Sequence, residues 1–354
     1  MKTLDIVVGG QFGSEAKGHV TKKVLQRRQF ERPEGPELVN VRVAGPNAGH
    51  CVLDEAGNKF ALRTIPVGAV LPDVRLVIAA GSEVDPQVLS DEIAELTAKG
   101  HDLRGRLYVS AEATVLTQQH REAEAGMQAR MGSTGKGIGA ARADRIMRTA
   151  ARVGDDADLS EFIAEAGGVV FTDPQPFDMD DKSVVIEGTQ GYGLGLHAGH
   201  YPQCTSSDCR AVDFAAMAGL NPWDAEQFIP WVVARVYPIR VAGNSGPLKG
   251  ESSWEDLGLP QEYTTVTKKV RRVGEWDADL IAAAMAANGK NSQLAITMLD
   301  QKFEEVKGLD NTQQPNQLRY LGDDPLDFLW TGLPGVRFGQ ISLVTTGEDT
   351  GVWL

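Results

Sequence analysis

The stretch GGQFGSEAKGH, residues 9–19, follows an apolar run and has the residue types of a phosphate-binding turn. Its glycines allow a sharp turn with exposed backbone N–H groups, and a helix starting near Glu15 would add the positive end of its dipole. Lys17 adds a full positive charge. The spacing differs from Walker A, because Ala16 precedes the lysine and Gly18 follows it. The pattern favours phosphate binding, although a strand-to-helix turn with an exposed lysine would look the same.

Three later stretches carry side chains that suit a nucleotide. The segment GPNAGH places Asn47 and His50 around two small residues, where a ligand can approach the backbone. Residues 132–148 combine hydroxyls with spaced arginines, the natural partners of a monophosphate. Residues 187–208 include Gln190, whose amide can donate and accept at the edge of a base. Taken singly, a structural histidine or a flexible loop before a basic helix explains these patterns almost as well.

A fifth stretch, TTVTKKVRRVG at residues 264–274, presents four cations within five residues. Such a run is usually a solvated surface loop. The whole chain, however, has 35 basic and 48 acidic residues and a net charge of −13, so these cations could equally close over a dicarboxylate. The negative balance predicts no nucleic-acid partner, since that requires a basic face, but it permits a small phosphorylated substrate.

The remaining composition predicts a protein of a reducing compartment. Cys51, Cys204 and Cys209 are odd in number, have no zinc-like spacing and are expected to be free thiols. Met1 leads directly into a strand pattern, which predicts no signal peptide. No apolar stretch approaches the roughly 20 residues that cross a bilayer. We therefore expect a cytoplasmic protein, in a host cytoplasm if it is phage-encoded, with no membrane partner.

The elements that must position these stretches alternate between strand and helix patterns. Apolar runs predict strands at residues 4–8, 74–80, 107–110, 184–187, 231–237 and 294–299. Helical spacing appears at residues 15–28, 85–99 and 277–288, the last ending at Gly289. Long polar stretches interrupt the pattern at residues 40–50, 132–148, 188–210, 242–274 and 345–351. This order predicts an α/β fold, residues 1–354 as a single domain, with a central, mostly parallel sheet, helices on both faces and one active site built from long loops.

Together the five stretches resemble the adenylosuccinate synthetase family. Its opening loop reads Gly-Asp-Glu-Gly-Lys-Gly-Lys, and residues 13–19 read GSEAKGH. Four further motifs of the family recur in order: Asn-Ala-Gly-His at 47–50, Thr-Gly-x-Gly-Ile-Gly at 134–139, Glu-Gly-x-Gln-Gly at 187–191 and Tyr-Pro-x-x-Thr-Ser-Ser at 201–207. The resemblance runs from residue 5 to the C-terminus and implies an adenylosuccinate-synthetase-like fold.

The resemblance also implies a reaction and a set of roles. The 6-oxygen of the purine monophosphate attacks the γ-phosphate of a nucleoside triphosphate, and L-aspartate then displaces the phosphate from C6. Catalysis would involve Ser14, Lys17, His50 and Gln190, with His50 as the acid or electrostatic partner. Magnesium would bridge the donor phosphates with Ser14 and Gly49. A homodimer is expected, in which Arg148 reaches the neighbouring site.

Three binding sets follow from the same resemblance. The monophosphate would be bound by Ser14, Asn47, Ala48, Ser133, Thr134, Arg148, Gln190, Thr205 and Arg240. L-Aspartate would be bound by Thr267, Lys269 and Arg271. The donor would be bound by Gly13, Glu15, Ala16, Lys17, Gly18, Gly49, His50, Thr297, Asp300, Thr345 and Gly347.

The main departure from the family is Ser14, which stands where the family has the aspartate that removes the N1 proton of IMP. A serine hydroxyl is a poor base and a weak magnesium ligand. A smaller side chain beside C2 leaves room for a 2-amino group, and a phage-encoded branch of the family carries serine here and acts on dGMP. That branch gives 2-amino-2′-deoxyadenylosuccinate, the precursor of diaminopurine in DNA. We therefore expect dGMP, with IMP as the alternative and a catalytically silent nucleotide-binding protein as the third reading.

The second departure concerns the phosphate donor. The family recognises guanine with Thr-Lys-Leu-Asp and Ser-Thr-Gly-Pro, and the matching positions here read Thr-Met-Leu-Asp at 297–300 and Thr-Thr-Gly-Glu at 345–348. The lysine that packs on guanine is absent and Glu348 adds a second carboxylate, which together weaken the case for GTP. Asp300 could accept a hydrogen bond from the adenine amino group instead. ATP or dATP is expected as donor, with GTP as the alternative.

Overall fold

The computed structural model describes residues 2–31, 35, 37–126, 134–172, 182–264, 268–311 and 321–354. Within these residues, ten strands form one sheet in the order β16-β15-β14-β11-β1-β10-β2-β5-β7-β9. Neighbouring strands are parallel throughout, except that β15 and β16 are antiparallel. The strands are β1 (Thr3–Gly9), β2 (Glu37–Arg42), β5 (Val74–Ile78), β7 (Leu107–Ser110), β9 (Val169–Phe171), β10 (Lys182–Glu187), β11 (Gln227–Arg235), β14 (Gln293–Thr297), β15 (Ile341–Thr345) and β16 (Gly351–Trp353).

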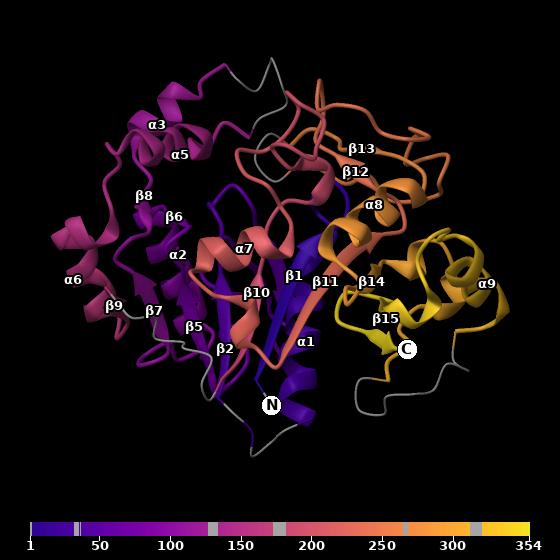
Figure 1. Cartoon of the computed structure of the whole chain (residues 1–354), viewed down its shortest axis with the longest axis horizontal. Helices are drawn as coiled ribbons and strands as arrows, with labels where there is room; N and C mark the ends of the chain where they lie inside the picture. Colours follow the sequence, from indigo (N-terminus) through magenta and orange to yellow (C-terminus); the bar gives the residue numbers. More distant parts are fainter. Residues whose placement is uncertain are drawn as a thin grey trace.

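Helices cover both faces of this sheet (Figure 1). They are α1 (Lys17–Glu31), α2 (Pro86–Ala98), α3 (Gln118–Ala123), α5 (Ile138–Met147), α6 (Ala157–Glu165), α7 (Ala211–Ala218), α8 (Ala278–Asn288) and α9 (Asp323–Thr331). Three two-stranded ribbons lie outside the sheet: β3 (His50–Leu53) with β4 (Lys59–Leu62), β6 (Glu83–Val84) with β8 (Thr114–Val115), and β12 (Ile239–Arg240) with β13 (Arg272–Val273). The predicted α/β class with a mostly parallel sheet is confirmed.

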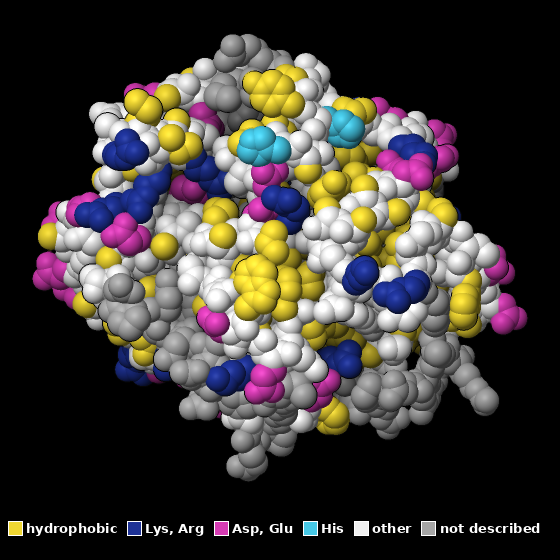
Figure 2. Space-filling view, in the orientation of Figure 1, with side chains coloured by type: hydrophobic (Ala, Val, Ile, Leu, Met, Phe, Trp, Pro, Cys, Tyr) yellow, Lys and Arg dark blue, Asp and Glu magenta, His cyan; other side chains and the backbone are white. Residues whose placement is uncertain are grey.

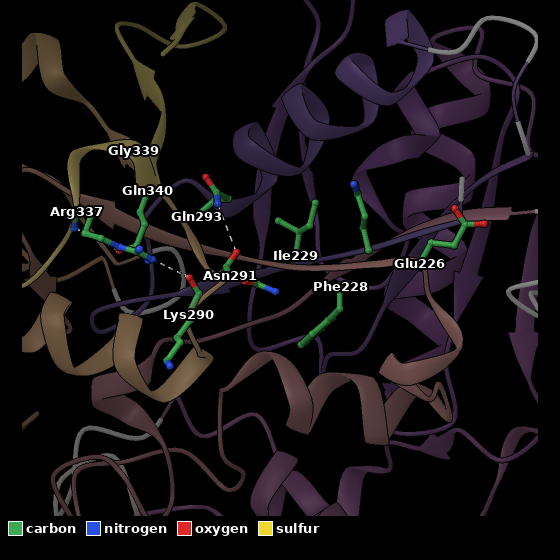
Figure 3. Close-up of a pocket in the computed structure, with 10 residues that line it drawn as sticks. Glu226, Phe228, Ile229, Lys290, Asn291, Gln293, Arg337, Gly339 and Gln340 are labelled. Carbon is green, nitrogen blue, oxygen red and sulfur yellow. Dashed lines mark hydrogen bonds between the residues drawn. The ribbon is translucent and has the colours of Figure 1, made fainter.

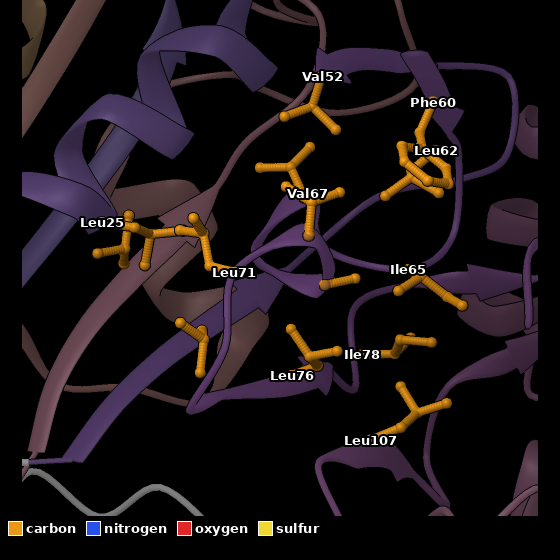
Figure 4. Packing of buried hydrophobic residues seen from close by; sticks show 14 of the residues in the cluster. Leu25, Val52, Phe60, Leu62, Ile65, Val67, Leu71, Leu76, Ile78 and Leu107 are labelled. Carbon is orange, nitrogen blue, oxygen red and sulfur yellow. The ribbon is translucent and has the colours of Figure 1, made fainter. Parts of the chain in front are cut away.

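Strand β1 shows how the sheet separates two hydrophobic cores. All seven of its residues are buried, and alternate side chains point to opposite faces of a strand. Leu4, Ile6 and Val8 pack into the core that α7 and α8 cover. Val7 packs into the other core, with α1 and α2. Figure 4 shows part of that core around Val67 and Leu76. Burial on both faces favours apolar residues along a strand, and the one charged residue of β1, Asp5, is paired with Arg28 at 2.8 Å.

The element boundaries differ from the sequence prediction at several places. Helix α8 confirms the predicted stop, since Gly289 caps it with φ 94°. The expected 231–237 strand begins at residue 227, and the expected loop at 40–50 contains the end of β2. The 132–148 stretch holds α5, whose glycine-rich start concealed its helical spacing.

The parallel strands place their carboxyl ends at one edge of the sheet, the upper edge in Figure 1. The segments that follow β1, β2, β10, β11, β14 and β15 all begin at that edge. They include the loops in which the sequence concentrates its unusual residues. An open parallel sheet binds ligands beyond the carboxyl ends of its strands. The fold therefore predicts one site at this edge.

Candidate active site

The opening loop turns tightly around the buried carboxylate of Glu15. That carboxylate accepts from the backbone N–H groups of Gln11 (3.2 Å) and Gly13 (2.7 Å) and pairs with Lys17 Nζ (2.5 Å). Ser14 (φ 59°) and Ala16 (φ 61°) both adopt left-handed backbone conformations, which cost energy in residues other than glycine. Because Glu15 binds the loop from within, its carboxylate does not face the site. Ser14 is the exposed side chain of the turn.

The loops after β1, β2 and β10 are in direct contact. A Cβ atom at Gly9 would overlap with the carbonyl oxygen of Gln190, so these two backbones touch. A Cβ at Gly18 would lie 2.8 Å from His50 Cβ, so the start of α1 lies against the histidine. A Cβ at Gly13 would lie 3.9 Å from Gln190 Oε1, which puts the Gln190 amide beside the opening loop. The structure thus brings together the predicted catalytic residues of three separate motifs.

His50 is held in place by buried charges. Its Nδ1 lies 2.5 Å from Glu187 Oε1, and Arg42 pairs with the same carboxylate. Burial, followed by the charge of Arg42, lowers the pKa of His50 to about 4, against the opposing charge of Glu187. Although burial acts in the other direction, Arg42 and then His50 keep the pKa of Glu187 below its usual range. A neutral ring that donates from Nδ1 to Glu187 leaves Nε2 as an acceptor for the site.

A buried glutamate, Glu124, lies at the helix start of the segment predicted to bind the monophosphate. Glu124 Oε2 accepts from Gly137 N (2.7 Å), and Oε1 accepts from Gly139 N (2.6 Å) and Ala140 N (3.3 Å). The first N–H groups of α5 are therefore occupied by a carboxylate. A phosphate here would be bound by side chains such as that of the half-buried Thr134. Ser133 lies outside the described residues.

The arginines of this segment have different partners. Arg142 pairs with Glu83 at 2.7 Å, and Arg145 pairs with Glu112 at 2.7 Å, so both are committed within the chain. Arg148 caps α5 with φ 65°, and its side chain is exposed and has no partner among the described residues. Of the three, Arg148 is the side chain available to a ligand or to a second copy.

Arg240 lies between the opening loop and the loop that contains Thr205. Arg240 is buried and donates to the Gln203 carbonyl (2.9 Å), and its guanidinium lies 4.2 Å from the centre of the Phe12 ring. Burial, and then the charge of Arg272, lower the pKa of Arg240 to about 10. Arg240 therefore joins the opening loop to the 201–207 segment. Asn47, Ala48 and Thr205 are half-buried at this edge.

The cationic segment contacts Ser14 directly. Arg271 Nη1 donates to Ser14 Oγ at 2.7 Å. Burial lowers the pKa of Arg271 from its ordinary high value, and a guanidinium remains charged at neutral pH. Lys269 is exposed, and Thr267 lies outside the described residues. The position predicted to bind L-aspartate and the residue that departs from the family are thus hydrogen-bonded to each other.

Of the residues predicted to bind the phosphate donor, Thr297 contacts the opening loop directly and Thr345 contacts the segment that follows Thr297. Thr297 is buried, and its hydroxyl donates to the Glu15 carbonyl at 3.0 Å, so it supports the loop. Thr345 is also buried and accepts from Met298 N at 2.9 Å. Asp300 is half-buried, burial raises its pKa, and its carboxylate makes no hydrogen bond to another described residue. A carboxylate in this setting can accept from either an adenine or a guanine amino group.

Glu348, the extra carboxylate of the donor-side loop, is paired outside the site. It accepts from Lys59 Nζ at 2.6 Å, and both side chains are exposed. This contact removes Glu348 as an argument against guanine. The choice of donor then depends on Met298, which stands at the position of the family's lysine.

The residues described by the structure contain no cluster of three or more His, Cys, Asp or Glu side chains that could hold a metal ion. Magnesium keeps several waters and binds mainly to substrate phosphates, so it needs few protein ligands. Gly49 is exposed, and a backbone carbonyl there is an appropriate oxygen ligand. Ser14 Oγ already faces the Arg271 guanidinium, which disfavours a second cation on that oxygen.

Four residues of this edge were missed by the sequence reasoning: Arg42, Glu124, Arg235 and Glu262. The first, third and fourth of these lie in buried or half-buried charge pairs whose partners are distant in sequence, as with Arg42 and Glu187, whereas Glu124 binds backbone N–H groups of α5. A charged residue at the end of an apolar strand, as at Arg42 and Arg235, was the available signal.

Other surfaces are distinct from this edge. A cavity of about 640 Å³ lies at the amino ends of β11, β14 and β15, lined by residues that include Phe228, Lys290 and Arg337 (Figure 3). On the face shown in Figure 2, basic and acidic side chains are intermixed.

The predicted free thiols are confirmed for all three cysteines. No helix in the described ranges is long and apolar enough to span a membrane.

Known proteins of one family are similar to this chain along most of its length. The family model for adenylosuccinate synthetase matches residues 6–171 and 175–310. An adenylosuccinate synthetase of Thermococcus sibiricus is 36% identical over 310 residues, covering 86% of each chain. One of Methanocaldococcus jannaschii is 35% identical over 358 aligned positions, covering 98% of this chain and 95% of the relative.

Two solved structures share the fold. The succinoaminodeoxyadenylate synthetase of cyanophage S-2L, bound to dGMP and to dATP as an energy donor, has a TM-score of 0.78 and 28% identity, covering 100% of this chain and 95% of that one. The fully ligated adenylosuccinate synthetase from Plasmodium falciparum has a TM-score of 0.74 at 18% identity, covering 99% of both chains. At that identity the second structure bears on the fold alone.

Proposed function

We propose that this chain, which belongs to the adenylosuccinate synthetase family, joins L-aspartate to C6 of dGMP. Members of the family are magnesium- and nucleoside-triphosphate-dependent carbon–nitrogen ligases, and this chain is a ligase of that kind. The proposed product is 2-amino-2′-deoxyadenylosuccinate, formed through a 6-phosphoryl intermediate and destined for diaminopurine in DNA. The observation that carries the proposal is the side chain at position 14.

The opening loop presents no carboxylate to the purine. Glu15 is fully buried within the loop, and Ser14 is the exposed side chain. A hydroxyl leaves more room beside C2 than a carboxylate and can accept a hydrogen bond from a 2-amino group. The phage structure, similar in fold over the whole of this chain, is bound to dGMP. Both observations support the 2-aminopurine substrate.

Each of the remaining site residues has a separate role in the proposed reaction. Gln190, beside the opening loop, would donate to the 6-oxygen. His50, neutral and oriented by Glu187, would face the oxygen that becomes phosphorylated. Lys17, which pairs with Glu15, and the N–H groups of the turn that Glu15 leaves unoccupied would bind the donor phosphates. Magnesium would neutralise their charge when bound, and the Gly49 carbonyl would be its protein ligand. Lys269 and Arg271 would bind L-aspartate.

The donor and the assembly are proposed with the substrate. ATP or dATP fits the loss of the guanine-packing lysine at Met298, and the phage structure is bound to dATP. Arg148 is exposed and its side chain has no partner in the part of the chain that the structure describes, which supports a homodimer in which it reaches the neighbouring monophosphate. IMP remains the second candidate, because the relatives at 35–36% identity are named adenylosuccinate synthetase.

Product analysis by mass spectrometry tests the proposal. The protein is incubated with L-aspartate and magnesium, with dGMP, GMP and IMP offered in parallel and ATP, dATP and GTP as competing donors. The expected result is a succinylated product from dGMP with an adenine nucleotide consumed. Product from IMP alone would contradict the substrate proposal and support ordinary adenine nucleotide synthesis. Absence of turnover with every substrate would contradict both.

A Ser14→Asp variant examines the reason for the preference. The added carboxylate occupies the space beside C2 and pairs with Arg271, so the ratio of kcat/KM for dGMP to that for IMP is expected to fall by about 10- to 100-fold. Ser14→Ala removes the hydroxyl but keeps the space beside C2 and adds no charge, so as the control it lowers this ratio less than Ser14→Asp does. An unchanged preference in the aspartate variant would count against position 14 as the determinant.

A further inference from the structure

We propose that Glu262 is a positioning residue for L-aspartate. The buried Arg235 holds Glu262, and Glu262 in turn fixes the position of Arg271. Glu262 and Arg271 belong to the two described arms of one segment, residues 261–264 and 268–271. The proposal rests on the proposed function in one respect, namely that L-aspartate is the ligand of Arg271. It assigns a role to two residues that lie outside the motifs of the sequence.

Arg235 ends strand β11 and is fully buried. Its Nη2 donates to Glu262 Oε1 at 2.6 Å, and its Nη1 lies 3.2 Å from Glu262 Oε2, a two-pronged pair. The same Nη1 donates to the Ser14 carbonyl at 3.4 Å. The backbone of Arg235 exchanges two hydrogen bonds of 3.0 Å with the side chain of Gln11. The end of strand β11 therefore contacts both the opening loop and the cationic segment.

The two arms transmit the position of Glu262 to Arg271. Arg271 N donates to the Glu262 carbonyl at 2.8 Å, and Thr264 N donates to the Lys269 carbonyl at 2.8 Å. A bridge between Tyr263 and Val270 adds a third link. Because the arms are paired in register, a displacement of Glu262 also displaces the Arg271 backbone.

The charges show why this arrangement suits a dicarboxylate. The Glu262 carboxylate is paired with the buried guanidinium of Arg235, so it does not form an ion pair with Arg271. On its other side Arg271 contacts the neutral hydroxyl of Ser14, which orients the guanidinium without neutralising it. A carboxylate at position 14 would neutralise it. The guanidinium thus keeps its full charge for the incoming acid.

The experiment compares Glu262→Gln, Glu262→Asp and Glu251→Gln in the full-length protein. The glutamine variant is expected to raise KM for L-aspartate by about tenfold, the cost of one charge-assisted contact, with KM for the monophosphate and donor nearly unchanged. The aspartate variant keeps the charge beside Arg235, so it stays folded, but its shorter side chain also raises KM for L-aspartate. Glu251 makes the same kind of two-pronged pair with Arg272 (2.7 and 2.6 Å) and leaves the opening loop untouched, so its variant behaves as wild type.

Calorimetric titration of L-aspartate and the Tm of each variant accompany the kinetics. A wild-type KM for L-aspartate in a folded Glu262→Gln or Glu262→Asp protein would overturn the proposal. So would an equal rise in all three KM values with a lowered Tm, which indicates a general structural role. Each assay uses whichever of dGMP and IMP the wild type converts. A wild type specific for IMP contradicts the dGMP proposal, while the L-aspartate readout still tests this one.

Discussion

At the residue scale, two hydrogen bonds define the chemistry that this site can perform. Ser14 accepts from a guanidinium, so its own proton is directed elsewhere and can be donated to a purine nitrogen or oxygen. His50 is bound through Nδ1 to Glu187, and its lowered pKa of about 4 keeps the ring neutral near pH 7. The site therefore presents two neutral, oriented groups, and one of them, Ser14, stands where the family's opening loop has an aspartate. The two are polarised by Arg271 and Glu187, respectively.

Replacing Glu187 tests this orientation. In Glu187→Gln the amide can donate to Nδ1, which favours the tautomer with its proton on Nε2. We expect kcat to fall by about 100-fold with little change in KM, since a misplaced proton removes the acid–base contribution of His50. Steady-state kinetics measure both constants, and the Tm reports the effect of leaving Arg42 without its charge partner.

Asp208→Asn is the matched control for that variant. Asp208 contacts Nδ1 of the exposed His197 at 2.6 Å, the same kind of pair outside the catalytic cluster. Its loss should leave kcat unchanged. A wild-type kcat in a folded Glu187→Gln protein would show that the Glu187 contact does not set the tautomer that catalysis needs.

At the element scale, helix α1 joins the donor-side loop to the opening loop. Lys22 is buried on α1 and donates to both Asp349 oxygens (2.9 and 2.8 Å) and to the Leu53 carbonyl (2.7 Å). Asp349 follows the predicted base-binding residues Thr345 and Gly347. The helix that begins at the phosphate-binding turn thus also holds the loop between β15 and β16.

An Asp349→Asn variant is expected to loosen this loop. Lys22 then loses its charged partner, and KM for the triphosphate donor should rise by about tenfold while KM for the monophosphate stays near the wild-type value. Glu348→Gln is the control, since the neighbouring Glu348–Lys59 pair is exposed and exposed pairs contribute little. Equal effects of the two variants on the donor KM would contradict the anchoring role of Lys22.

At the scale of the whole molecule, stability depends on two buried histidines. His19 lies on α1, its Nε2 is buried without a hydrogen-bond partner among the described residues, and burial, then Lys23, lower its pKa to about 4. His50 has a pKa lowered to the same value. In both cases the unfolded state binds a proton near pH 6.5 and the folded state does not.

The free energy of unfolding should therefore decrease as pH falls from 7 toward 4, because the unfolded state binds more protons throughout that window. A pKa lowered from 6.5 to about 4 corresponds to about 3 kcal/mol for His19. Urea unfolding as a function of pH measures the slope. His19→Gln should reduce the slope, whereas a variant of the exposed His197 should not. An identical slope in His19→Gln would show that other groups govern acid unfolding.

The sequence by itself determined the mainly apolar strands of the sheet, the α/β order, the five loops and their family. Those features follow from local patterns: β1 is buried on both faces, and Gly289 ends α8 because its positive φ, which glycine adopts without strain, does not continue a helix. The departure at Ser14 was likewise visible without coordinates.

Only the tertiary structure decided which charges face one another. The pairs Arg42–Glu187 and Arg235–Glu262 join residues far apart in the chain, so no local pattern specifies them. The same holds for the contact of Arg271 with Ser14 and for Glu124, which occupies the N–H groups of α5. Hydrogen bonds and ion pairs act over a few ångströms, and the sheet order that brings strand ends within that range results from packing of the whole chain.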